Sequence, residues 1–170
     1  MLTGFMGTGK TTVGRLLADR LGLALVDTDR EIEAEHGPIP EIFRDDGESG
    51  FRRLERRLAE RLADRHDVVV ATGGGMMVDP DVAGLLGSPP ARVFCLTASP
   101  ATILERVTGD PTGPERPLLA DPDRRRRIER LLAQRQRAYA RFEQVDTDGR
   151  SSEDVADEIV RRLDRSSRTN

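Results

Sequence analysis

The chain has 170 residues, a length that predicts one domain with a core of its own. The net charge of -3 gives no global basic character, which argues against a nucleic-acid partner. No apolar stretch reaches membrane-spanning length and no signal peptide precedes the first glycines, so we expect a cytoplasmic protein without a membrane partner. The single cysteine, Cys95, lies in an apolar run and is interpreted as a buried small hydrophobe rather than a reactive thiol.

The first motif runs from Gly4 to Thr12 and fits the phosphate-loop pattern of Gly, four residues, Gly-Lys, and Ser or Thr. Glycines allow the backbone to curl so that successive N–H groups point at phosphate oxygens. Lys10 would reach the β- and γ-phosphates, and the Thr11 hydroxyl would hold Mg²⁺. Apolar residues then follow at helical spacing up to Gly22, which predicts a helix whose positive end adds to the anion site. ATP and Mg²⁺ are therefore the expected cofactors.

Composition gives an independent argument for Lys10. The chain has 27 Lys and Arg residues, and Lys10 is its single lysine. Arginine presents a planar fork and lysine a compact point charge, so the two are not interchangeable at a crowded phosphate. The retention of lysine at this one position indicates a specific role.

Apolar strands alternate with helical patterns along the whole chain, which predicts an α/β fold with a parallel sheet. One domain, 1–170, is expected, without a repeat or a linker. The expected strands are 1–3, 23–26, 68–72, 92–97 and 144–147. The expected helices are 9–21, 29–36, 39–46, 48–65, 79–86, 100–108, 122–142 and 152–165, followed by a disordered tail, 164–170.

Asp27-Thr28-Asp29 directly follows the second expected strand. The carboxyl ends of parallel strands face the ligand crevice of an open sheet, so these carboxylates suit a kinase. One would lie near Mg²⁺ and the other at the acceptor hydroxyl. Asp27 or Thr28 could also cap the next helix, and the two roles are compatible.

Three further segments carry candidate site residues. Arg52 lies near the start of a charged helix, most of whose Arg and Glu residues are expected to form a solvated face. Gly73-Gly74-Gly75 ends the third expected strand, which indicates either close approach of the backbone to a ligand or a flexible loop. Residues 109–120 are rich in Pro and Gly and are interpreted as a lid that carries Arg116. Arg135, on a later helix, could face the same crevice.

Together these segments resemble shikimate kinase, and they occur in order over nearly the whole chain. The matching pieces are Gly4–Thr12, Asp27-Thr28-Asp29, Gly47-Glu48 with Phe51-Arg52 and Glu55, Gly73–Gly75, Arg116-Pro117-Leu118-Leu119, and Arg135 with Tyr139. The resemblance implies a nucleoside-monophosphate-kinase-like phosphate-loop fold, with five parallel strands, helices on both faces and a short first strand. It also implies a monomer.

The resemblance implies that the nucleotide binds along the phosphate loop and the lid. The residues that would contact ATP are Gly7, Thr8, Gly9, Lys10, Thr11, Thr12, Arg116 and Arg150. Thr11 would ligate Mg²⁺, with Asp27 close by. Lys10 and Arg116 would act on the transferring phosphoryl group.

The resemblance also implies the acceptor site, within the helices of residues 29–65 and on Gly73, Gly74 and Gly75. Asp29 would bind the ring hydroxyls and act as the base, and Arg52 and Arg135 would hold the acceptor carboxylate. The reaction would transfer the γ-phosphoryl group of ATP to the 3-hydroxyl of shikimate, a step towards chorismate and the aromatic amino acids.

Three departures from the family pattern carry their own expectations. Val107 occupies a position where the family often has an arginine against adenine, and the adjacent Arg106 is expected to project elsewhere. Residues 109–115 are about one residue longer than usual. The chain starts three residues before the loop, so we expect the natural first strand to begin upstream.

Two alternatives remain. Another small-molecule kinase, such as one for gluconate, would share the phosphate loop but not the Phe51-Arg52 motif or the three glycines. A catalytically weak nucleotide-binding protein would accord with the short start and Val107. An intact set of Lys10, Asp29 and Arg116 argues against it.

Overall fold

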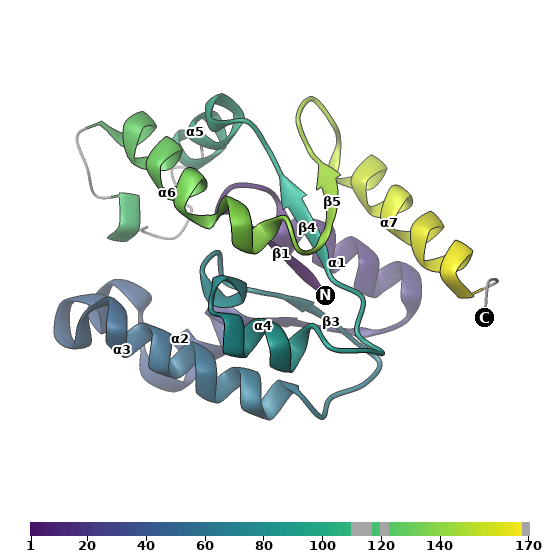
Figure 1. Ribbon diagram of the computed structural model, residues 1–170, viewed down its shortest axis with the longest axis horizontal. Helices are drawn as coiled ribbons and strands as arrows, with labels where there is room; N and C mark the ends of the chain where they lie inside the picture. Colours follow the sequence, from purple (N-terminus) through teal and green to yellow (C-terminus); the bar gives the residue numbers. More distant parts are fainter. Residues whose placement is uncertain (110–116, 120–122, 168–170) are drawn as a thin grey trace.

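The computed structural model describes residues 1–109, 117–119 and 123–167, which form a five-stranded sheet between two layers of helices (Figure 1). All strand pairs are parallel. The strands are β1 (Leu2–Gly4), β2 (Ala24–Asp27), β3 (Val68–Ala71), β4 (Phe94–Thr97) and β5 (Glu143–Asp146), in the order β2-β3-β1-β4-β5. The five strands predicted from the sequence are thus present with small shifts at their ends, and the predicted fold class is confirmed.

Helices cover both faces of this sheet. The helices are α1 (Lys10–Leu21), α2 (Thr28–His36), α3 (Ile39–Leu62), α4 (Pro80–Leu86), α5 (Pro100–Thr108), α6 (Arg124–Tyr139) and α7 (Ser152–Ser167). Short 3₁₀ turns occur at η1 (Met76–Val78) and η2 (Pro117–Leu119). None of the helices in the described part of the chain has the length and apolar character needed to cross a bilayer.

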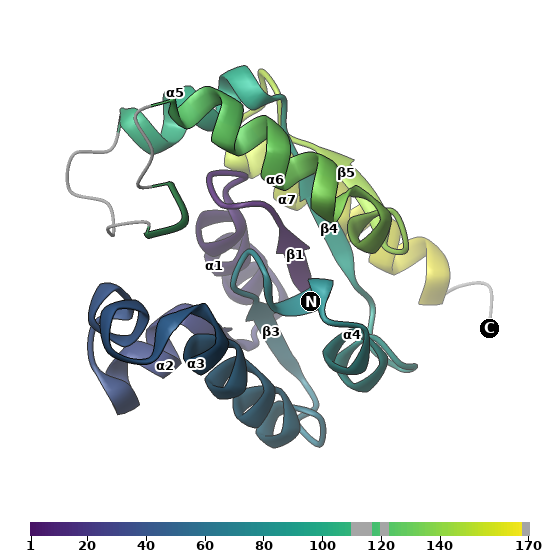
Figure 2. The ribbon, with the colours of Figure 1, turned by 60° about the vertical axis from the view of Figure 1, so that its left-hand side comes forward.

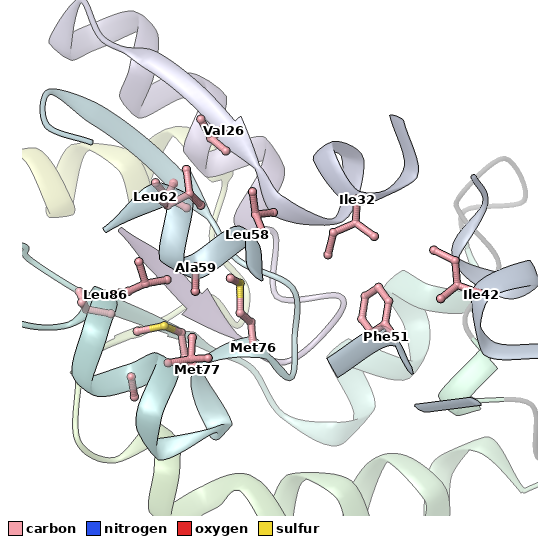
Figure 3. Close-up of a cluster of buried hydrophobic side chains, with 14 residues drawn as sticks. Val26, Ile32, Ile42, Phe51, Leu58, Ala59, Leu62, Met76, Met77 and Leu86 are labelled. Atoms are coloured by element: carbon pink, nitrogen blue, oxygen red, sulfur yellow. The ribbon is translucent and has the colours of Figure 1, made fainter. Parts of the chain in front are cut away.

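The two layers follow from the alternation of side chains along buried strands. Val69 packs with the side chains of α1 and α7 on one face, whereas Val70 packs with those of α3 and α4 on the other. Figure 3 shows this second cluster, in which Leu58, Ala59 and Met76 lie together. Both faces of the central strands are therefore buried, as a parallel sheet requires.

A third apolar cluster lies under α5 and α6, on the same side of the molecule as the phosphate loop. It includes Phe5 of the phosphate loop, Cys95 of β4, and Ile128 and Tyr139 of α6. Cys95 is fully buried, as the sequence predicts, and burial raises the pKa of its thiol to about 11. The thiol is therefore uncharged at neutral pH.

The predicted break between the helices 39–46 and 48–65 is confirmed, because Gly47 has a non-helical φ of 67° and ψ of -177° that kinks α3 there. Two other details differ from the prediction. The helix expected to end at residue 65 ends at Leu62. The disordered tail expected from residue 164 is wrong for residues 164–167, because α7 continues to Ser167. Residues 168–170 lie outside the described residues.

The sheet brings the predicted motifs to one edge. β1 is only three residues long, yet it lies in the centre of the sheet and pairs with β4 along its length. β2 and β3 are in register from Ala24 with Val68 to Asp27 with Ala71. The phosphate loop, the Asp27–Asp29 segment and the three glycines therefore all follow strands that end on the same side.

Candidate active site

A cavity of about 960 Å³ opens at the carboxyl ends of the strands and is lined by residues from α2, α3, α5 and α6. Figure 2 shows the α2–α3 pair on one side of this region and the α5–α6 pair on the other. The size of the cavity suits two small molecules held side by side. It is lined by the phosphate loop, by Asp27 and Asp29, by Arg52 and Glu55 of α3, and by Arg135 of α6. The structure therefore brings together residues that are more than 120 positions apart in the chain.

The phosphate loop forms the floor of the cavity. Residues 7–12 all line it, and the loop leads directly into the first turn of α1. The Lys10 ammonium donates a hydrogen bond to the Phe5 carbonyl oxygen at 2.9 Å, so the side chain lies back across the loop. The Thr8 hydroxyl donates to the same carbonyl oxygen at 2.8 Å. The lysine charge and the positive end of α1 would act together on an anion bound in the loop.

Thr11 and Asp27 lie at the place where a phosphate-bound metal ion is expected. The Thr11 hydroxyl donates to Asp27 Oδ2 at 2.6 Å, and Asp27 Oδ1 accepts from the backbone N–H of Arg30 at 3.3 Å. Asp27 thus caps α2, which confirms one of the two roles considered from the sequence, and it also contacts the phosphate loop. Hard oxygen ligands of this kind suit Mg²⁺, which usually takes one or two protein groups and completes its shell with phosphate and water. The described residues contain no group of three or more His, Cys, Asp or Glu side chains that would form an all-protein site.

Asp29 points into the cavity from the first turn of α2. Its Oδ1 atom is buried and has no hydrogen-bond partner among the described residues. Burial raises the pKa of Asp29, and the nearby positive charge of Lys10 opposes that shift. An unpartnered buried carboxylate oxygen is costly, and a ligand hydroxyl is a suitable donor for it.

An added Cβ at any of the three glycines would come close to a different part of the site. A Cβ on Gly73 would lie 2.4 Å from Asp29 Oδ1 and 2.8 Å from Glu55 Oε1. A Cβ on Gly74 would lie 3.2 Å from the backbone nitrogen of Met6. On Gly75 it would lie 2.3 Å from Arg52 Nη1. The segment is therefore a close-packed part of the site, not a flexible loop.

Arg52 is held between two carboxylates of its own helix. Its Nη1 donates to Glu55 Oε2 at 2.5 Å, and its Nη2 donates to Glu48 Oε1 at 2.8 Å. Glu55 is only 2 % exposed, and its Oε1 has no partner among the described residues. Burial raises the pKa of Glu55 to about 7, and the charge of Arg52 opposes the shift. The sequence motif that contains Phe51, Arg52 and Glu55 does not by itself assign a role to Glu55. The signal for its role is that Glu55 lies three residues after Arg52, which places both side chains on one face of the helix.

Arg135 reaches the site from α6, as the sequence predicts. Its Nη1 donates to the Gly74 carbonyl oxygen at 3.0 Å, and its guanidinium carbon lies 5.4 Å from the centre of the Phe5 ring. The Tyr139 hydroxyl donates to the same Gly74 oxygen. Two side chains one turn apart on α6, Arg135 and Tyr139, therefore both donate to the carbonyl oxygen of Gly74.

Arg106, not Val107, faces the nucleotide end of the cavity. Its Nη1 donates to the Thr147 hydroxyl at 2.9 Å and approaches the Gly7 carbonyl oxygen at 3.4 Å, while its Nη2 donates to the Thr147 carbonyl oxygen at 2.8 Å. The expectation that Arg106 projects elsewhere is therefore wrong. Consecutive residues on a helix point about 100° apart, so the face that Arg106 presents depends on how α5 is docked.

Arg150 lines the same end of the cavity, as expected. It is tied down by Glu158, whose Oε2 accepts from Arg150 Nη1 at 2.6 Å. Arg116 and the longer segment around it fall on residues outside the described ranges, as does most of the expected lid, 109–120. Pro117 and Leu118, which belong to the expected lid and directly follow Arg116, line the cavity.

Known proteins resemble this chain along nearly its whole length. A family model described as shikimate kinase matches residues 6–164. A shikimate kinase of Thermus thermophilus is 46% identical over 165 residues, which cover 95% of this chain and 88% of that protein. A solved shikimate kinase from Acinetobacter baumannii in complex with shikimate is 34% identical, with a TM-score of 0.88, and covers 95% of this chain and 90% of that one. A solved gluconokinase from Sinorhizobium meliloti, at 22% identity and a TM-score of 0.68 over 99% of this chain and 92% of that one, shares the fold alone.

Proposed function

This chain belongs to the shikimate kinase family, and from that premise we propose that it transfers the γ-phosphoryl group of ATP to the 3-hydroxyl of shikimate. One observation carries the proposal. Asp29 Oδ1, Glu55 Oε1 and the Arg52 guanidinium converge on the glycine segment in the cavity that also holds the phosphate loop. The carboxylate of the acceptor needs a cation such as the Arg52 guanidinium. The hydroxyl that is phosphorylated needs a group such as Asp29 to accept its proton.

Each side chain has a definite task in this reaction. The acceptor oxygen forms a bond to the γ-phosphorus, and the bond from that phosphorus to the β–γ bridging oxygen breaks to release ADP. Asp29 takes the proton of the acceptor hydroxyl. Lys10, seated across the loop, stabilises the negative charge on the transferring group. Arg52 and Arg135 bind the acceptor carboxylate and orient the ring.

Thr11 and Asp27 would hold Mg²⁺, because their oxygen atoms are paired at 2.6 Å beside the phosphate loop. When bound there, the ion supplies positive charge that neutralises the phosphate oxygens. Gly7–Thr12, with Arg150, would contact the nucleotide. We assign the protein to the cytoplasm as a monomer that needs no nucleic acid or membrane, in accord with its use of ATP and its single buried thiol.

Product formation with different acceptors tests the proposal. ATP consumption should depend on shikimate, and nuclear magnetic resonance of the product should place the phosphate on the 3-hydroxyl. Gluconate and the methyl ester of shikimate should be poor acceptors. Faster turnover of gluconate than of shikimate would favour a gluconate kinase. A rate of ATP hydrolysis that is the same with and without shikimate would favour a catalytically weak nucleotide-binding protein.

Variants of α3 test the carboxylate contact. Arg52→Ala should raise the KM for shikimate by at least about 30-fold, because loss of one partner of a desolvated charge pair costs about 2–5 kcal/mol. Arg56→Ala is the matched control, since Arg56 lies on the same helix and pairs at the surface with Asp79 at 2.6 Å. Equal effects of the two variants would contradict the role of Arg52.

A further inference from the structure

The Gly74 carbonyl oxygen is the meeting point of two donors from α6. Arg135 Nη1 donates to it at 3.0 Å, and the Tyr139 hydroxyl donates to it as well. A carbonyl oxygen has two lone pairs, so these donors satisfy it completely. Arg135 and Tyr139 are one helical turn apart, which places both on the same face of α6.

Gly74 also connects the two halves of the site. Its α-carbon faces the phosphate loop, where a Cβ would lie 3.2 Å from the Met6 nitrogen. The N–H of the preceding Gly73 donates to the Thr28 hydroxyl at 2.7 Å, and the following Gly75 lies under Arg52. A rotation of the peptide between Gly74 and Gly75 would therefore disturb the contact of Gly75 with Arg52 on the acceptor side.

The Tyr139 hydroxyl is not needed to fill space. The residue is 6 % exposed, and its ring packs in the cluster that contains Phe5, Ile128 and Leu131. Burial raises the pKa of Tyr139 to about 12, so its hydroxyl remains protonated and able to donate at neutral pH. A phenylalanine would keep the ring, and Arg135 would still satisfy the Gly74 oxygen.

The geometry points to Tyr139 as a positioning residue for acceptor binding. Its hydroxyl donates to the Gly74 carbonyl oxygen and so fixes the orientation of the Gly74 peptide. Because Arg135 donates to the same oxygen, the Tyr139 hydroxyl also fixes the position of the Arg135 guanidinium. Arg135 has five N–H donors, and one goes to Gly74. With Tyr139 fixing the peptide, the others can be directed at the acceptor carboxylate. This inference rests on the proposed function of Arg135.

Tyr139→Phe tests the inference. The KM for shikimate should rise about tenfold, which corresponds to a loss of about 1.4 kcal/mol in binding free energy. The kcat and the KM for ATP should change less than about twofold, and the melting temperature should stay within about 2 °C of the parent. A purely structural role would lower the melting temperature without this selective effect on shikimate.

Gln144→Ala is the matched control. Gln144 Nε2 donates to the carbonyl oxygens of Tyr139 at 2.7 Å and Phe142 at 2.8 Å, so its loss loosens the end of α6 without touching the hydroxyl. It should leave the KM for shikimate unchanged. An equal rise in that KM would show that any loosening of α6 suffices and would overturn the role of the hydroxyl.

A double-mutant cycle gives a second readout. Because Tyr139 and Arg135 share one carbonyl oxygen, Tyr139→Phe and Arg135→Lys should have effects on the KM for shikimate that do not multiply. Effects that multiply, or an unchanged KM in Tyr139→Phe, would overturn the inference. A parent protein that fails to phosphorylate shikimate would instead refute the proposed function.

Discussion

The Arg52 guanidinium lies directly over the α-carbon of Gly75, where an added Cβ would be only 2.3 Å from Nη1. The same guanidinium is fixed by Glu48 and Glu55 on two of its nitrogens. The glycine and the arginine therefore depend on one another, although 23 positions separate them in the chain. The clash would fall on the end of a long side chain, so its effect should be on function more than on stability.

Gly75→Ala should accordingly raise the KM for shikimate by about tenfold or more while lowering the melting temperature only slightly. Gly84→Ala is the control, because Gly84 lies in α4 with nothing within 4 Å of an added Cβ. Replacement of a helical glycine by alanine stabilises by about 0.5–1 kcal/mol. Steady-state kinetics with thermal melting separates the two variants, and normal acceptor kinetics in Gly75→Ala would mean that Arg52 is not held as described.

Asp29→Asn should lower kcat by about 10²–10⁴-fold with ATP binding retained, because an amide cannot accept the hydroxyl proton. The amide keeps the size of the side chain, so folding should not be affected. Single-turnover kinetics and nucleotide titration measure the two quantities. A change confined to the KM for shikimate would make Asp29 a binding residue only.

Lys10→Ala should abolish turnover, since the contact with the transferring phosphate is lost. Lys10→Arg should also lose most activity, because a forked guanidinium does not fit where the ammonium sits at 2.9 Å from the Phe5 carbonyl oxygen. Coupled assays at saturating ATP and shikimate measure both. Near-normal turnover in Lys10→Arg would contradict the argument that arginine cannot replace lysine at this position.

Glu55 should make the free energy of unfolding depend on pH. Its pKa rises from 4.5 in the unfolded chain to about 7 in the fold. Between these values the folded state holds a proton that the unfolded state has released, so stability falls as pH rises through the window. The loss amounts to about 3 kcal/mol. Glu55→Gln cannot titrate.

The stability of Glu55→Gln relative to the parent should therefore increase by about 3 kcal/mol between about pH 4 and pH 8. Urea unfolding of both proteins across this range measures the difference, and groups that titrate equally in both cancel. A difference that does not vary with pH would contradict a buried carboxyl with a raised pKa.

Arg106→Ala should raise the KM for ATP more than the KM for shikimate. Its guanidinium joins Gly7 of the phosphate loop to Thr147 after β5, so its loss removes an anchor at the nucleotide end of the cavity. Val107→Ala serves as the comparison. A larger effect on ATP from Val107→Ala would restore the assignment expected from the sequence.

Local features of the sequence determined the strands, the phosphate loop and the positions of most candidate site residues at the cavity. Glycine spacing, the position of Lys10 and the apolar runs are short-range signals, because backbone conformation and side-chain alternation depend on near neighbours. The placement of Asp27 and Asp29 followed from one further rule, that parallel strands end on the ligand side of the sheet. These predictions are confirmed by the positions of β2, α1 and the cavity.

Only the tertiary structure decided the strand order, the burial of Glu55, the direction of Arg106 and the sharing of the Gly74 carbonyl by Arg135 and Tyr139. Each of these depends on contacts between segments far apart in the chain. Burial sets the pKa of a carboxyl group, and it is a property of all the surrounding elements rather than of a motif. A helix also turns about 100° per residue, so the side chain that faces a site is known only when the helix is docked.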